Sequence, residues 1–174
     1  MKYSVLLFGL LLGFISNSQN TVCLIIENNP NTNVSGLSPF TKYVNVLDCF
    51  SVYAESTISD AKVLHAAAVA AELLDNDENG FVDDPALKSA LQSSDALIPI
   101  FSQENSSAEN QFFTQYNGEG AAAVLYNNEM DPNQTGYWGS DATVEEVIHV
   151  INAVGHTSLQ YTPMHSLLNP TLLS

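Results

Sequence analysis

The sequence contains no arginine and only four lysines, whereas aspartate and glutamate together number 19. Its formal net charge at pH 7 is therefore -15. Polyanions repel such a chain, so the composition argues against nucleic acid and anionic membrane surfaces as partners. Charged residues make up 13% of the chain and hydrophobic residues 45%, so we expect it to fold rather than remain disordered. A length of 174 residues is enough for one domain with a hydrophobic core.

Long hydrophobic runs are also lacking, with one exception near the N-terminus. Residues 5–15 form an apolar run that is too short to span a bilayer comfortably. Lys2 precedes this run, and the small residues Ser16 and Ser18 follow it, a pattern typical of a secretory signal peptide cleaved after Ser18. The alternative is an N-terminal anchor or a buried strand. We predict that residues 1–18 are a signal peptide and that the mature protein is secreted, without a membrane span.

Cysteine is equally scarce, since Cys23 and Cys49 are the only two. An even count fits one disulfide in an oxidising compartment, and the alternative is a pair of buried free thiols. Three glycosylation sequons begin at Asn33, Asn105 and Asn133, each in a polar stretch that is typical of a loop. Both features predict an extracellular glycoprotein.

Residue patterns along the chain predict a single α+β domain over residues 19–174, with a mixed sheet and two main helices. The main helices are expected at 59–74 and 143–154, the second one ending at Gly155. Asp84 followed by Pro85 is a typical start for a shorter helix, expected over 85–92. Strands are expected at 21–27, at 42–55 (as one strand or two short ones), at 96–101 and within 120–129.

Oxygen-bearing groups recur at alternate positions directly after the first main helix. With Asp75 as position one, the residues at positions one, three, five, seven and nine are Asp75, Asp77, Asn79, Phe81 (through its carbonyl) and Asp83. Gly80 is at the sixth position, where a tight turn needs a positive φ. Alternate residues of a turning backbone can point their oxygens at one centre, and calcium takes six to eight hard oxygen ligands.

This spacing resembles the calcium loop of the EF-hand family, whose pattern begins D-x-[DN]-x-[DN]-G. The flanking helices match as well, but Ala86 stands where the family has a bidentate glutamate. Asp83 or Asp84 would then supply the missing oxygens, as in shorter extracellular calcium loops with dissociation constants on the order of 10⁻⁴ to 10⁻³ M. The resemblance implies calcium bound by residues 75–84. The alternative is a solvated turn in which Asp84 only caps the next helix, although repulsion among the carboxylates favours a cation.

The helix expected at 143–154 carries a polar stripe opposite its apolar face. Glu145 and His149 are four residues apart and point the same way, so they could hold one metal ion. Asn152 continues the stripe, and His156 could extend it just past the end of the helix.

The same segment resembles the active helix of the zincin metallopeptidases, which reads H-E-x-x-H. The resemblance implies Glu145 in place of the first histidine ligand, Glu146 as the catalytic general base and His149 as the second zinc ligand. His156 and His165 are candidates for a third ligand. A carboxylate in place of an imidazole weakens zinc binding. The order of elements also resembles that family, so a zincin-like arrangement is expected.

A structural explanation of this helix remains open. Thr143 and Glu146 have the spacing of a capping box, and both glutamates of the first turn suit the helix dipole. His149 is then an ordinary surface or packed histidine. His65, on the first main helix, is expected at the edge of the core rather than as a ligand.

The leading hypothesis is a secreted, glycosylated protein that binds calcium on a zincin-like, non-catalytic domain. Calcium would fix the angle between the helices that flank its loop. The alternative is a secreted zinc peptidase that uses the helix 143–156. A third hypothesis is a truncated product of a longer peptidase-like protein. The sequence does not indicate a protein or peptide partner.

Overall fold

A five-stranded mixed sheet forms the centre of the computed structural model, which describes residues 22–133 and 141–156. Its strands are β1 (Glu27–Asn28), β2 (Lys42–Val46), β3 (Phe50–Ala54), β4 (Leu97–Phe101) and β5 (Leu125–Tyr126), and they lie in this order across the sheet. The pairs β1–β2 and β2–β3 are antiparallel, whereas β3–β4 and β4–β5 are parallel. The predicted α+β class with a mixed sheet is confirmed.

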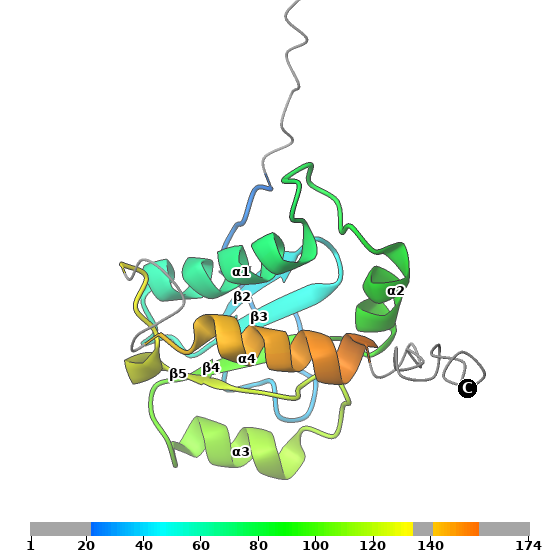
Figure 1. Ribbon diagram of the computed structural model, residues 1–174. Helices are drawn as coiled ribbons and strands as arrows, with labels where there is room; N and C mark the ends of the chain where they lie inside the picture. The colour runs from blue at the N-terminus through cyan, green and yellow to red at the C-terminus, as the bar shows by residue number, and fades with distance from the viewer. Residues whose placement is uncertain (1–21, 134–140, 157–174) are drawn as a thin grey trace, which may run out of the picture.

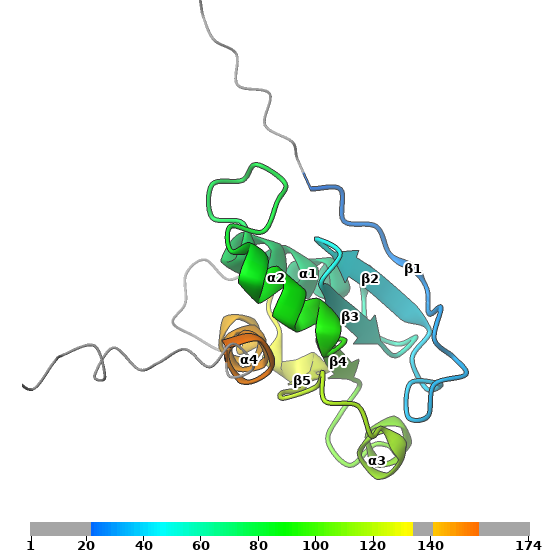
Figure 2. The ribbon, with the colours of Figure 1, turned by 90° about the vertical axis from the view of Figure 1, so that its right-hand side faces the viewer.

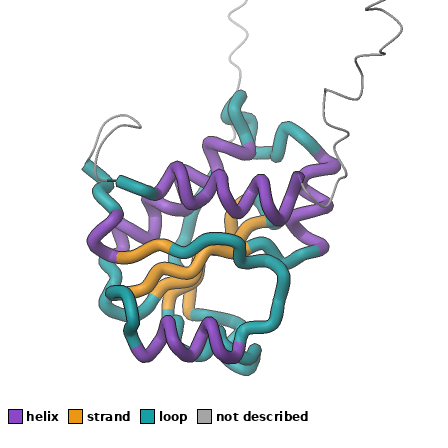
Figure 3. Tube along the Cα trace, turned by 60° about the horizontal axis from the view of Figure 1, so that its bottom comes forward, coloured by secondary structure: helices purple, strands orange, loops and turns teal. Residues whose placement is uncertain are grey.

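Helices cover both faces of this sheet. They are α1 (Asp60–Leu74), α2 (Pro85–Ser93), α3 (Ser107–Gln115) and α4 (Thr143–Val150), which continues as the π-helical η2 (Ile151–His156); η1 (Asn127–Glu129) is a short 3-10 turn. Figure 1 shows α1 and α4 side by side on one face, with α3 beyond the strands. The strands lie between these two helical layers (Figure 3). Figure 2 shows α2 beside the end of α4, and α2 packs against η2.

Local sequence explains where the long helices begin. Ser59 is the N-cap residue of α1, and its extended backbone is typical of that position. The Asp84 side chain accepts hydrogen bonds from the backbone N–H groups of Ala86 and Leu87, and Pro85 occupies the first position of α2. Both predicted helix starts are therefore confirmed.

Two apolar clusters hold the layers together. The larger one fills the space between the sheet and helices α1, α2 and α4, and it contains the strand residues Val44, Val52 and Ile98. The smaller one lies on the α3 face and contains Leu37, Phe40, Tyr53, Leu97, Phe101 and Phe112. Alternate strand residues thus enter different clusters, as the two-residue period of a strand requires.

Several predicted boundaries differ from the structure. In place of the strand expected at 21–27, only Glu27 and Asn28 pair with another strand. Their partners on β2 are Tyr43 and Lys42. The segment 42–55 forms two strands, joined by a turn in which Leu47 and Asp48 both have positive φ. The polar segment after β4 forms a complete helix, α3.

Two predictions about single residues were wrong. Gly155 does not end the second main helix, because η2 continues through it to His156. A Cβ at Gly155 would lie 2.4 Å from Leu87 Cδ1, so glycine permits the close approach of α2 at this point. Cys23 and Cys49 do not form the expected disulfide: Cys23 is an exposed free thiol and Cys49 a buried one.

Within the described ranges, no helix has the length and hydropathy needed to cross a membrane. The predicted signal peptide, His165 and most of the Asn133 sequon lie outside the described residues. Asn33 and Asn105 are exposed in loops, as their sequons predict.

Candidate calcium site

The loop between α1 and α2 is built by a change of backbone direction at the end of α1. Asp75 is the C-cap residue, and its N–H still donates to the Ala71 carbonyl at 2.9 Å. Glu78 (φ 55°) and Gly80 (φ 88°) then adopt left-handed conformations, as the loop pattern requires at the glycine. The N–H of Asp83 donates to the Leu74 carbonyl at 2.9 Å and closes the loop. The chain therefore returns to its starting point after one tight turn.

Three carboxylates gather inside this turn. One carboxylate oxygen from each of Asp75, Asp77 and Asp83 lies within 4.8 Å of the others. Calcium binds oxygen at 2.3–2.6 Å, so two ligands of one ion are at most about 5 Å apart. The separation of these oxygens fits ligands of a single calcium ion. In residues 22–133 and 141–156 this is the only group of three or more acidic, histidine or cysteine ligands at such distances.

Hydrogen bonds from the loop hold the carboxylates in place. Asp75 accepts from the N–H groups of Asn79 (3.0 Å) and Gly80 (2.7 Å). Asp77 accepts from the side-chain amide of Asn79 at 2.9 Å. Asp83 accepts from the backbone and side-chain N–H groups of Asn76, at 3.1 and 2.9 Å. The oxygens are therefore oriented by the same backbone that brings them together.

Asp75 is the most informative member of this group. It is only 3% exposed, and a buried carboxylate is costly unless its charge is compensated. No lysine or histidine among the described residues forms an ion pair with it, since the ion pairs there involve only Asp60, Asp141 and Glu145. A bound cation would supply the missing charge.

The remaining predicted calcium ligands have separate positions. The Phe81 side chain is 65% exposed and carries no ligand atom, so only the Phe81 carbonyl could contribute. Asn79 Oδ1 accepts a hydrogen bond from the Phe81 N–H at 2.9 Å. Asp84 caps α2 instead of joining the three carboxylates. Val82 is buried in the larger core cluster, a contribution that the sequence did not indicate.

The second predicted metal group, on α4, brings only two of its expected ligands together. Glu145 Oε1 and His149 Nε2 are 3.7 Å apart on α4, and both side chains are more than half exposed. Asn152 is also exposed, so the predicted polar stripe exists. His156, on η2, does not join them within ligand distance in the described part of the chain. The helix therefore offers two adjacent metal ligands rather than three.

Glu146, the predicted general base, faces a different side of α4. It lines a hollow of about 380 Å³ with Glu129 and the segment 121–124. Burial raises the pKa of Glu146; nearby His149 opposes the rise, and Glu145 and Glu129 add to it. A carboxyl with a raised pKa is a feature of general acid–base catalysis, but Glu146 is not beside a complete metal centre here.

The predicted capping box of α4 does not form. Ala142 is the N-cap residue and makes no side-chain cap, whereas Asp141 accepts hydrogen bonds from the N–H (3.0 Å) and the hydroxyl (2.6 Å) of Thr143. The other oxygen of Asp141 lies 2.6 Å from His65 Nε2. His65 thus joins α1 to the start of α4, a structural role in agreement with its expected place at the edge of the core.

Comparison of the chain with protein-family models, with curated proteins and with solved structures found no match.

Proposed function

We propose that this protein is a secreted calcium-binding protein whose loop 75–84 binds one calcium ion in a structural role. The observation that carries the proposal is the convergence of Asp75, Asp77 and Asp83, whose oxygens lie within 4.8 Å of one another. The EF-hand-like spacing of the same residues supports it, as does the burial of Asp75 without a basic partner.

Calcium would act on the helices that flank the loop. The three carboxylates would hold the ion together with the Phe81 carbonyl, and the hard charge of calcium would offset their mutual repulsion. The loop joins α1 to α2, and α2 packs against η2 at Gly155. Restraining the loop therefore restrains α2 against the end of α4.

Calorimetric titration of the chelator-stripped protein with calcium tests this proposal. We expect one site, with a dissociation constant on the order of 10⁻⁴ to 10⁻³ M, as in extracellular modules. Asp75→Asn should abolish the binding. Glu78→Gln is the matched control, because Glu78 is exposed in the same loop, loses the same charge and is not at a ligand position. Binding that is absent in the parent, or unchanged in Asp75→Asn, would refute the calcium site.

Equilibrium dialysis of the protein against millimolar calcium and micromolar zinc, with metal analysis of both compartments, separates this function from the zinc peptidase hypothesis. Calcium alone is expected. Stoichiometric zinc that is lost in His149→Ala would instead favour the peptidase and would assign Glu145 and His149 to its metal. Secretion and glycosylation are tested by the mass of the secreted chain before and after removal of N-linked glycans, which should fall if Asn33 or Asn105 is modified.

A further inference from the structure

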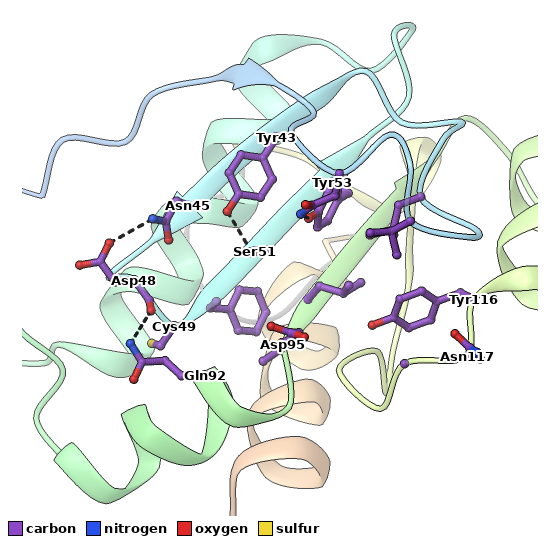
Figure 4. A pocket seen from close by; sticks show the side chains of 17 residues that line it. Tyr43, Asn45, Asp48, Cys49, Ser51, Tyr53, Gln92, Asp95, Tyr116 and Asn117 are labelled. Atoms are coloured by element: carbon purple, nitrogen blue, oxygen red, sulfur yellow. Dashed lines mark hydrogen bonds between the residues drawn. The ribbon is translucent and has the colours of Figure 1, made fainter.

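One part of the sheet face opposite α1 and α4 is not covered by a helix. On this face α3 covers the sheet near Phe101, where Phe112 packs against it. The part of the same face formed by β2 and β3 is the floor of a cavity of about 500 Å³. On this floor Tyr43 lies opposite Tyr53, and Asn45 lies opposite Ser51. Figure 4 shows these side chains on the strands, with others reaching in from the surrounding segments.

Aromatic rings line this cavity in fixed positions. The ring centroids of Tyr43 and Tyr53 are 5.1 Å apart, and the Tyr53 hydroxyl accepts a hydrogen bond from Asn31 at 2.6 Å. Tyr116, which follows α3, is stacked on Phe112 with centroids 4.8 Å apart. Tyr53 is only 2% exposed and supports the neighbouring ring of Tyr43, so the tyrosines that offer surface to a ligand are the half-buried Tyr43 and Tyr116. Their orientations are set before any ligand arrives, which reduces the entropy cost of binding.

The charge of the cavity is negative. Asp48 and Asp95 line it, whereas no lysine, arginine or histidine does so in the described part of the chain. Asp48 already accepts a hydrogen bond from Asn45 at 3.0 Å. Asp95 has φ 50°, a left-handed conformation that fixes its position at the start of β4.

Asp95 is also close to two of the tyrosines. Burial raises the pKa of Tyr53 and of Tyr116, and the Asp95 carboxylate adds to the rise in both. In Figure 4 the Tyr116 hydroxyl points toward the side of the cavity where Asp95 lies. One carboxylate therefore lies within electrostatic reach of tyrosines from β3 and from the segment after α3.

We propose that this cavity binds a small organic cation bearing an alkylated ammonium group. Aromatic rings attract cations through the negative charge of their faces, and Asp95 supplies a counter-charge beside them. Anionic ligands are disfavoured by the two carboxylates and by the net charge of -15. The cavity also has the size of a small-molecule site, which ranges from about 300 to 1,000 Å³.

Ligand-observed and protein-observed NMR titrations test this proposal with a matched pair of probes. The first probe is choline, and the second is its uncharged isostere, in which a tert-butyl group replaces the trimethylammonium group. Titrations are done with chelator present, so that occupancy of the calcium loop plays no part. We expect saturable binding of choline, with a dissociation constant on the order of a millimolar, and at least about fivefold weaker binding of the isostere.

Substitutions locate the binding. Asp95→Asn should weaken choline binding by about fivefold, and asparagine tolerates the left-handed backbone at this position. Glu72→Gln is the control, because Glu72 is exposed on α1, on the opposite face, and loses the same charge. Tyr43→Phe should retain the affinity because it keeps the ring, whereas Tyr43→Leu should weaken binding by roughly threefold.

Three results would overturn the proposal. Choline and its isostere could bind equally, which would show that the charge is not recognised. Glu72→Gln could weaken binding as much as Asp95→Asn, which would show general attraction to an acidic protein. Saturable binding of a neutral sugar such as maltose, without binding of choline, would assign the cavity to a polyhydroxylated ligand instead.

Discussion

Calcium is expected to raise the thermal stability of this protein, and Asp75→Asn to remove that increase. A ligand that binds only the folded state stabilises it by RT ln(1 + [L]/Kd). With about 10 mM calcium and a dissociation constant of roughly 10⁻⁴ to 10⁻³ M, the gain is about 1.4 to 2.7 kcal/mol. For a domain of this size that gain corresponds to a rise in melting temperature of roughly 3 to 10 °C.

The comparison that matters is each variant with and without calcium. Asp75 accepts hydrogen bonds from two backbone N–H groups, and asparagine retains one acceptor oxygen, so the substitution alone costs about 1 kcal/mol. Asp77→Asn provides a second test at an exposed carboxylate whose loss threatens folding less. Glu78→Gln should keep the full calcium-dependent rise.

Melting curves in chelator, in calcium and in magnesium at equal ionic strength provide the measurement. An equal rise in magnesium, or an equal loss of the rise in Asp75→Asn and in Glu78→Gln, would show that the ion only screens the acidic surface. Either result would refute the coordination argument.

Three further predictions concern parts of the structure outside the loop. Burial disfavours the charged form of Asp141, but hydrogen bonds from Thr143 and His65 lower the pKa of Asp141 overall. The ionised carboxylate therefore stabilises the folded protein above the ordinary pKa near 4, and this stabilisation is lost as the pH falls below that value. Urea unfolding should therefore show Asp141→Asn destabilised by about 1 to 2 kcal/mol at pH 7 and by less below about pH 4. Cys23 should react with a thiol reagent in the native protein, whereas Cys49, whose pKa burial raises to about 11, should react only after unfolding. A native protein with no reactive thiol, or with two, would contradict this prediction. Gly36→Ala should cost about 2 to 3 kcal/mol in urea unfolding, because Gly36 has φ 86° and its Cβ would lie 2.6 Å from the backbone nitrogen of Tyr116; an unchanged midpoint would contradict this packing.

Features with local causes could be predicted from the sequence. The start of α2 depends on the Asp84–Pro85 pair, whose effect extends over one helical turn, and α1 begins after Ser59, which serves as N-cap through its backbone. The acidic loop is local as well, since all its carboxylates lie within nine positions of one another. Its spacing predicted the group that the structure brings together at Asp75, Asp77 and Asp83.

Features that depend on distant residues could not be predicted in this way. The turn between β2 and β3 uses Leu47 and Asp48 at positive φ instead of the asparagine–glycine pair that would have indicated it. The alternating pattern of residues 22–26 is present in the structure, with Leu24 and Ile26 partly buried, but strand pairing depends on the position of β2. A short polar segment gave little indication of α3, whose apolar contacts come from Phe112 against the sheet.

The same limit applies to the candidate sites. Asp83 and Asp84 are adjacent and chemically identical, and only the fold assigns one to the acidic group and the other to the cap of α2. Asp141 was missed because its partner His65 is 76 residues away. The cavity on the β2–β3 face was missed for the same reason, since Asp95 and Tyr116 come from segments far along the chain from Tyr43 and Tyr53.

The surroundings of the acidic loop favour a structural role for calcium over a sensing one. A sensor responds to calcium by separating two helices and exposing an apolar groove. Here the apolar residues on both sides of the loop, Leu74 of α1 and Leu87 and Leu91 of α2, are already buried in the larger core cluster. Separating α2 from η2 would expose Leu87 and Leu91, which face Gly155 of η2, to water. The cost is roughly 1.5 to 3 kcal/mol for each one, as much as or more than weak calcium binding can supply. Calcium bound at this loop would therefore stabilise this packed arrangement of α1, α2 and α4 rather than open it.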